Sequence, residues 1–454
     1  MKKLLILLLL SVFVGCSTET LLPEIAEEAD AEIAVEIESP ENGENDEGYG
    51  NDNDNDSEVA GETTEISGFK ADAIAFADHV ERYHPIFVMP ELLADNYDKI
   101  REEFIRAAGE ADNLTEFAFA MQHFATVLRD GHMSNISYRA IEERKYLDAN
   151  FVMRESRLYL IQDDESDWKV VSIGGIAAYD IFQTIGRYFY FENETDRNFI
   201  ITQMSRSVTL LEWAGAQRDG EFIAISLYRE GQYNENLIEI MPTPFRIPPV
   251  RPDYVIRTEM LEGNVFLIDL RTFVDDPGIA EAENAIREAI DNGMRHFILD
   301  LRDNRGGNSF IGTRLFSAMG ISHPGFGGVR RSAPGRPGAS HSDRSTASRN
   351  PNDVIVAVLS NAETFSSGRW PVAWVIDGDL GIVVGEPPRN APTAFGNMGN
   401  PITLEYTGIQ AMLSTTRWLR PDRYADQTTL WPDIQVDPRY ALEAALEFFA
   451  SLEG

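Results

Sequence analysis

The stretch "DVIVAVLSNAETFSSGRWPVAWVID", residues 353–377, joins two apolar segments through a turn that contains two adjacent serines. The first segment, Val354 to Leu359, is short and rich in β-branched residues, which predicts a buried strand. The second predicts a helix. Ser366 therefore lies where a strand gives way to a helix, and the helix N–H groups could be capped by its hydroxyl or could stabilise an oxyanion beside it. The stretch alone leaves both roles open.

Strand and helix patterns alternate on both sides of this turn. Such alternation predicts an α/β fold with crossover connections and a largely parallel sheet, whose ligand site lies beyond the carboxyl ends of the strands. "DNRGGN" (303–308) and "NAETFSS" (361–367) both follow such ends. Strands are expected at 264–270, 296–302, 353–360 and 381–386, and helices at 278–293, 310–320 and 367–377.

Residues 323–352 interrupt the alternation with Gly, Pro, Ser and Arg. A segment of this length and composition indicates a loop that is mobile or that covers a site. Its arginines could receive acidic groups of a substrate, although a solvated loop is the simpler interpretation.

Three regions are expected in the folded part of the chain. Helical spacing predicts a small helical domain at 68–145, and short alternating runs predict a mostly β module at 146–245. The proline-rich segment 241–253 marks the boundary with the α/β region at 246–454. At 387 residues (454 − 67), the folded part is long enough for two or three domains.

The amino terminus resembles a bacterial lipoprotein signal. Two lysines precede an apolar run from Leu4 to Val14 that is too short to cross a bilayer, and the only cysteine, Cys16, follows Gly15. We expect residues 1–16 to be a signal peptide ending at a lipidated Cys16, which would place the protein outside the cytoplasm on a membrane anchor.

The segment 17–67 contains 18 acidic residues and no Lys or Arg, which predicts a disordered tether. The net charge is −35; without the tether (−18) and the signal (+2), residues 68–454 still carry −19. Acidity of this size argues against nucleic acid as a partner.

A nucleophilic serine needs a base, usually histidine or lysine. All six lysines lie at or before Lys169, so none belongs to the α/β region. Among seven histidines, His132 stands out because Asp130 and Gly131 predict a turn that presents its imidazole outside the preceding helix. His79 and His123 fit helical faces and are better explained as packed or solvated, so His132 is the more suitable candidate for a base.

Taken together, several segments resemble the S41 family of serine peptidases, which includes the tail-specific and tricorn-core enzymes. "HFILDLRDNRGGN" is similar to the family's glycine-rich strand end, "VAVLSNAETFSSG" to its nucleophile segment, and "IVVGEP" and "TTLWPDIQV" to later segments. "YHPIF" and "RDGHM" resemble the branch that uses histidine. The resemblance implies a core like that of ClpP and crotonase, and it places a PDZ-like domain at the β-rich module, where a purely structural cap is the alternative.

The resemblance also implies site residues. It makes Ser366 the nucleophile and His132 the general base, with an oxyanion hole from the amide of Ser367 and that of Gly306 or Gly307. Asp426 is the best substitute for the glutamate that would orient the histidine. This chain departs from the family at Gly131, where a serine may occur, at Arg369, where a glutamate is frequent, and near Ala391, which lacks the lysine of the tail-specific branch.

These residues imply hydrolysis of a peptide or unfolded protein through an acyl-enzyme, with no cofactor. The alternatives are an inactive relative that binds peptides or small apolar ligands, and an esterase. Motifs for zinc and for a nucleotide-binding P-loop are absent from the sequence, so no metal is expected.

Overall fold

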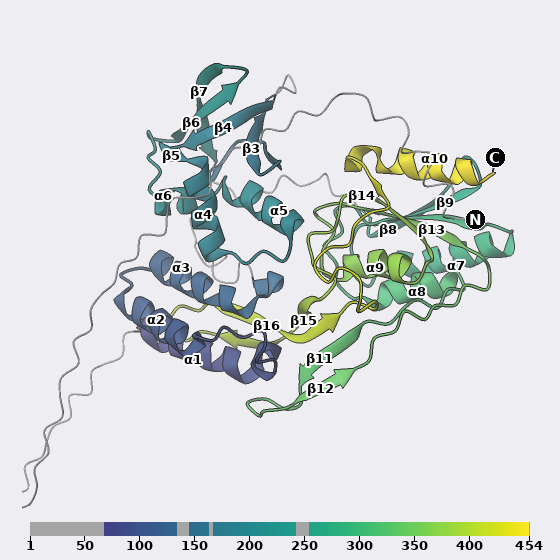
Figure 1. Cartoon of the computed structure of the whole chain (residues 1–454), viewed down its shortest axis with the longest axis horizontal. Coiled ribbons are helices and arrows are strands. Elements are labelled where there is room, and N and C mark those ends of the chain that lie inside the picture. The colour runs from purple at the N-terminus through teal and green to yellow at the C-terminus, as the bar shows by residue number, and fades with distance from the viewer. Residues whose placement is uncertain (1–67, 134–144, 163–166, 242–253, 454) are drawn as a thin grey trace, which may run out of the picture. The chain divides into compact units, whose positions relative to one another are not determined.

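The structure of the chain is a computed structural model that describes residues 68–133, 145–162, 167–241 and 254–453, all within one compact unit (Figure 1). The predicted signal peptide, Cys16 and the acidic tether lie outside the described residues. No helix within the described ranges combines the length and the apolar character needed to cross a bilayer.

A six-stranded sheet forms the centre of the α/β region, in the order β17-β14-β13-β10-β9-β8. Its strands are parallel except β8, which pairs antiparallel with β9. The predicted α/β class is confirmed. The strands are β8 (Ile256–Leu261), β9 (Val265–Leu270), β10 (His296–Asp300), β13 (Ile355–Ser360), β14 (Gly381–Gly385) and β17 (Ile434–Gln435).

Helices cover both faces of this sheet, as parallel strands require. Every residue of β9 is buried: Phe266 and Ile268 pack with one set of helices, and Val265 and Leu267 with the C-terminal helix. The first set is α7 (Pro277–Asp291), α8 (Phe310–Ala318) and α9 (Arg369–Asp377), and the C-terminal helix is α10 (Ala441–Glu453) (Figure 1).

A four-stranded sheet, β12-β11-β16-β15, corrects the expectation of a loop at 323–352. The segment contains a hairpin, and its first strand pairs with β16, about ninety residues further along the chain. Glycine is depleted in strands, so this strand depends on its pairing with β12 and with the distant β16. The strands are β11 (Gly327–Arg331), β12 (Ala339–Ser342), β15 (Ala394–Thr403) and β16 (Gln410–Leu419).

The predicted N-terminal helices pack against this second sheet. Phe76, Phe117 and Phe124 share one core with Phe395 of β15 and Leu413 of β16. The helices are α1 (Gly68–Tyr83), α2 (Tyr97–Glu110) and α3 (Leu114–Ala125), with short 3₁₀ turns η2 (Pro85–Val88), η3 (Thr126–Leu128) and η4 (Gly131–Met133).

The β-rich region forms a seven-stranded sheet in the order β1-β7-β6-β4-β3-β2, with β5 paired to β4. It also contains two helices, α5 and α6, that the sequence patterns did not predict. A PDZ-like identity for this region stays a prediction. Its elements are β1 (Tyr146–Leu147), β2 (Phe151–Arg154), β3 (Arg157–Ile161), β4 (Asp167–Ile173), β5 (Ile176–Ala177), α4 (Ala178–Tyr188), α5 (Glu194–Met204), α6 (Val208–Trp213), β6 (Phe222–Arg229) and β7 (Gln232–Met241).

The start of α5 docks the β-rich region onto the α/β region. Asn193 caps the helix by accepting from the Asp196 amide at 2.9 Å, and its own side-chain amide donates to the carbonyls of Pro388 (3.3 Å) and Thr428 (3.0 Å). Asp196 forms a buried ion pair with Arg389 at 3.4 Å. One capping motif therefore joins regions that are about two hundred residues apart in sequence.

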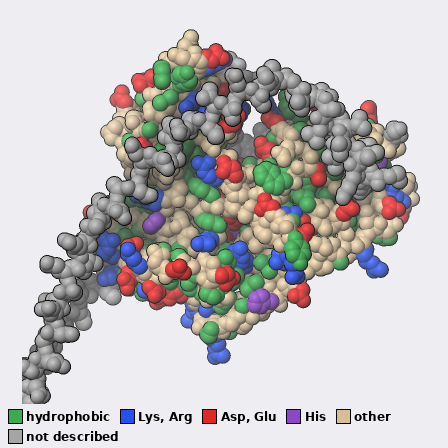
Figure 2. Space-filling view, in the orientation of Figure 1, with side chains coloured by type: hydrophobic (Ala, Val, Ile, Leu, Met, Phe, Trp, Pro, Cys, Tyr) green, Lys and Arg blue, Asp and Glu red, His purple; other side chains and the backbone are tan. Residues whose placement is uncertain are grey.

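Charged side chains of both signs are interspersed on the face drawn in Figure 2. Since 18 of the acidic residues belong to 17–67, much of the chain's negative excess lies outside the described residues.

Burial raises the pKa of Asp196 to about 7; Arg389 opposes the change and Glu192 adds to it. This pKa exceeds the value of about 4 in the unfolded chain. The stabilisation by the Asp196 carboxyl is therefore complete below about pH 4 and is lost as the pH rises through about 7. We predict that Asp196→Asn removes this part of the pH dependence. In the unmodified chain, this carboxyl should lower the free energy of unfolding by about 1.4 kcal/mol per pH unit between the two pKa values.

Urea unfolding between pH 4 and pH 8 measures this dependence. Asp180→Asn, at an exposed position of α4, is the control and should leave the profile of the unmodified chain unchanged. Parallel profiles for the unmodified chain and Asp196→Asn would contradict the prediction.

Candidate active site

The structure brings together the two residues that the sequence singled out. The Nε2 atom of His132 lies 3.1 Å from the Oγ atom of Ser366, across 234 residues of sequence. The imidazole also packs against the ring of Phe365, at 4.9 Å between centroids. Ser366 stays partly exposed, so a substrate can reach its hydroxyl while the histidine is held beside it.

Ser366 occupies a strained turn between β13 and α9. Its φ is 53°, in the left-handed region that serine seldom adopts, and it opens the 3₁₀ turn η6 (Ser366–Gly368). Its amide donates to Oδ1 of the buried Asn390 at 3.0 Å, and its carbonyl accepts from Arg369 at 3.2 Å. The side chains of Asn390 and Arg369 thus hold the turn from both sides, and the residue that caps it is Phe365 rather than Ser366.

Asp130, rather than Asp426, lies beside His132. Its Oδ1 accepts from the backbone amide of His132 at 2.9 Å and is 3.5 Å from the Nδ1 atom of the ring. The second distance is longer than an ordinary hydrogen bond. This placement directs Nδ1 toward a carboxylate and leaves Nε2 to accept the serine proton.

A second histidine, His84, contacts the other oxygen of Asp130. Its Nε2 lies 3.3 Å from Oδ2, while its Nδ1 accepts from the Ile86 amide, so the ring proton belongs on Nε2. Burial by itself raises the pKa of Asp130, but the contacts with His132 and His84 outweigh burial and hold the pKa below its usual range. Asp130 therefore stays ionised and can stabilise an imidazolium.

The expectation for Asp426 is corrected. Its carboxylate is exposed and accepts hydrogen bonds from Thr428, Thr429 and the indole of Trp431. These contacts close a local turn. The carboxylate of Asp426 is therefore used within that turn and does not orient His132. Asp130 lies two residues before His132 in the sequence, but the Asp130-Gly131 pair was interpreted only as the signal of a turn.

The predicted oxyanion donors were the amide of Ser367 and that of either Gly306 or Gly307. The Gly306 amide donates to Asn304 Oδ1 at 2.8 Å, so it is already used. Within the described ranges, the amides of Gly307 and Ser367 donate to no protein acceptor. A Cβ on Gly306 would approach the Ser367 nitrogen to 2.6 Å, and Gly307 has φ 135°, so both positions favour glycine.

Glu192, which the sequence did not single out, lies beside the same histidine. Its Oε1 accepts from the Gly131 amide at 3.0 Å, and its Oε2 accepts from the amide of Ala391 at 2.7 Å and from the side chain of Asn390. Burial raises its pKa, while His132 and Arg369 oppose the change. It reaches the site from the β-rich region, and no sequence signal links it to either turn.

Asp130, His132 and Glu192 carry ligand-type atoms within 4.8 Å of one another. The oxygens of both carboxylates already face backbone or side-chain donors. These residues therefore suit a hydrogen-bonded network better than a metal site.

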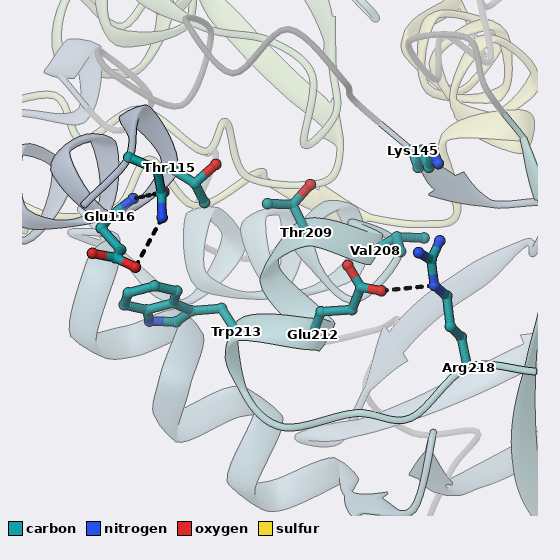
Figure 3. A pocket seen from close by; sticks show the side chains of 9 residues that line it. Thr115, Glu116, Lys145, Val208, Thr209, Glu212, Trp213 and Arg218 are labelled. Carbon is teal, nitrogen blue, oxygen red and sulfur yellow. Dashed lines mark hydrogen bonds and ion pairs between the residues drawn. The ribbon is translucent and has the colours of Figure 1, made fainter. Parts of the chain in front are cut away.

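A cavity of about 540 Å³ lies apart from these residues, between α3 and α6 (Figure 3). Among the charged side chains that line it, Glu212 is paired with Arg218 at 3.1 Å, and Glu116 accepts a hydrogen bond from the side chain of Asn113 at the start of α3. None of the residues that line it belongs to the Ser366 site.

Comparison with known proteins gives a match over the α/β region. Residues 264–436 match the model of Peptidase family S41, a range that contains Ser366 and both glycines but not His132 or Asp130. No curated protein sequence matches the chain.

Solved structures resemble a larger part of the chain. Mature CPAF complexed with lactacystin has 12% sequence identity and a TM-score of 0.58, covering 85% of this chain and 98% of its own. Mature CPAF gives the same identity and TM-score, covering 85% and 96%. The photosystem II D1 C-terminal processing protease has 14% identity, 84% and 97% coverage, and a TM-score of 0.43. The likeness to CPAF is one of fold. Residues 264–436 are therefore similar to the domain that defines Peptidase family S41.

Proposed function

We propose that this chain is a membrane-anchored, extracytoplasmic serine peptidase that hydrolyses peptide bonds through an acyl-enzyme. The observation that carries the proposal is the contact of 3.1 Å between Ser366 Oγ and His132 Nε2 at a strained turn. Two backbone N–H groups beside it, those of Gly307 and Ser367, donate to no acceptor in the part of the chain that the structure describes. A serine, an aligned base and oxyanion donors are the groups that acyl transfer requires.

Each residue has a defined role in the proposed reaction. Ser366 Oγ attacks the peptide carbonyl while its proton passes to His132 Nε2, and the N–H groups of Gly307 and Ser367 stabilise the oxyanion. The imidazolium is stabilised by Asp130 and then protonates the departing amine. Water, activated by the same imidazole, hydrolyses the acyl-enzyme and frees the peptide, so the chemistry needs no cofactor.

The substrate is a peptide or an unfolded protein, and the anchor is the lipid on Cys16. The lipoprotein-like signal and the acidic segment after it support an anchored enzyme that is held away from the membrane surface.

We expect Ser366→Ala and His132→Ala each to abolish cleavage of an unstructured protein, because each removes a group that the chemical step uses. Mass spectrometry of the peptide products measures this, and labelling of Ser366 by an organophosphonate reports the nucleophile separately. If all three proteins gave the same peptide pattern, or none cleaved while ligand binding persisted, a binding protein would be the better description.

We expect Asp130→Asn to lower kcat by about 10³-fold or more, since a neutral amide no longer stabilises the imidazolium and disturbs the histidine tautomer. Asp426→Asn is the matched control and should retain the activity of the unmodified chain, apart from a small loss of local stability. Steady-state kinetics on one peptide compares them. The opposite ranking of the two variants would restore Asp426 as the orienting acid.

We expect Cys16→Ser to abolish lipid attachment and to release the protein from the membrane fraction, because serine offers no thiol for the acyl linkage. Metabolic labelling with a fatty acid and cell fractionation test this. An equal yield of labelled, membrane-bound protein from both forms would contradict the proposed anchor.

A further inference from the structure

Glu192 lies between the two turns that carry the catalytic groups. On one side its carboxylate accepts from the amide of Gly131, the residue before His132, at 3.0 Å. On the other side it accepts from the side chain of Asn390, whose Oδ1 in turn accepts from the Ser366 amide at 3.0 Å. A continuous chain of hydrogen bonds therefore runs from the histidine turn to the serine turn through this one carboxylate.

Gly131 and Arg369 both suit a carboxylate at this place, one by its size and the other by its charge. A Cβ on Gly131 would lie 2.5 Å from Glu192 Oε1, so any larger residue there would displace the carboxylate. Arg369 is fully buried, donates to Asn390 Oδ1 at 2.6 Å, and has its pKa lowered to about 10 by burial, with the charge of Glu192 opposing the change. Gly131 and Arg369 are two of the positions at which this chain departs from the S41 pattern.

The backbone of Glu192 is anchored as well as its side chain. Its amide donates to Asp196 Oδ2 at 3.1 Å, within the capping motif that docks α5 onto the α/β region. The carboxylate itself is buried and faces three N–H donors, which offset part of its desolvation. A buried acid with both ends restrained can hold its neighbours at defined distances.

We propose that Glu192 is a positioning residue that aligns the His132 turn with the Ser366 turn, so that the β-rich region supplies part of the catalytic apparatus. This inference rests on the proposed peptidase function. It gives the region a role other than that of a cap or of a domain that binds a substrate's terminus.

Glu192→Gln is the direct test because it keeps the size of the side chain and removes its charge. A carboxamide has a single oxygen, so in either orientation an NH₂ group must face an N–H donor, at Gly131 or at Asn390 and Ala391. We expect kcat to fall about 10²-fold with KM nearly unchanged, because a small misalignment affects the chemical step more than binding. Organophosphonate labelling of Ser366 should slow by a similar factor.

Glu194→Gln is the matched control, since Glu194 lies two residues further along with 64% of its side chain exposed. It should keep the kcat, the KM and the labelling rate of the unmodified chain. Titrating active sites with the organophosphonate corrects kcat for any unfolded fraction. A second pair of variants, Asn390→Ala alone and with Glu192→Gln, tests the connection: the combined loss in kcat should be less than the product of the single losses, since both break one chain.

Amide hydrogen exchange separates this inference from the proposed function, because it needs no turnover. In the unmodified chain the amides of Gly131 and Ser366 should be protected, and Glu192→Gln should raise the exchange rate of both at least tenfold while Glu194→Gln does not. Unchanged exchange at Ser366, or a loss of kcat fully explained by fewer active sites, would overturn the positioning role. An unmodified chain that cleaves no peptide, yet shows this exchange pattern, would instead overturn the peptidase.

Discussion

The buried carboxylate of Asp130 is the interaction on which the site depends. A charge removed from water destabilises a protein unless donors surround it, and here the backbone of His132 and the ring of His84 supply them. His84 and His132 belong to different turns of the helical region, so the same charge organises that region and orients the catalytic ring. The His132 ring is thereby held in the orientation that places Nε2 beside Ser366.

The second constraint is the strained backbone of Ser366. A left-handed serine persists only when its surroundings hold it there, and Asn390 and Arg369 contact it from the amide and carbonyl sides. The conformation leaves the neighbouring Ser367 amide free, next to that of Gly307. The hydrogen bonds that hold the strained turn thus also place the oxyanion donors. Glu192 connects this turn to the histidine turn.

Sequence patterns predicted the central sheet well because buried parallel strands are continuous apolar runs, as in Val354 to Leu359. They failed at 323–352, where a glycine-containing strand forms between β12 and the distant β16. They also failed for the orienting acid: the resemblance to a family directed attention to Asp426, whereas the nearer Asp130 performs the contact. Glu192 was beyond reach, since a single acid between two helices carries no periodicity and no motif.

The sequence by itself determined the class of the fold, because strand and helix periodicity are local properties of the chain, and its resemblance to a family pointed to Ser366 and His132. Only the tertiary structure decided which carboxylates serve them and which glycine amide stays free. Those choices depend on burial and on distances between segments up to two hundred residues apart, where packing determines which hydrogen bonds can form.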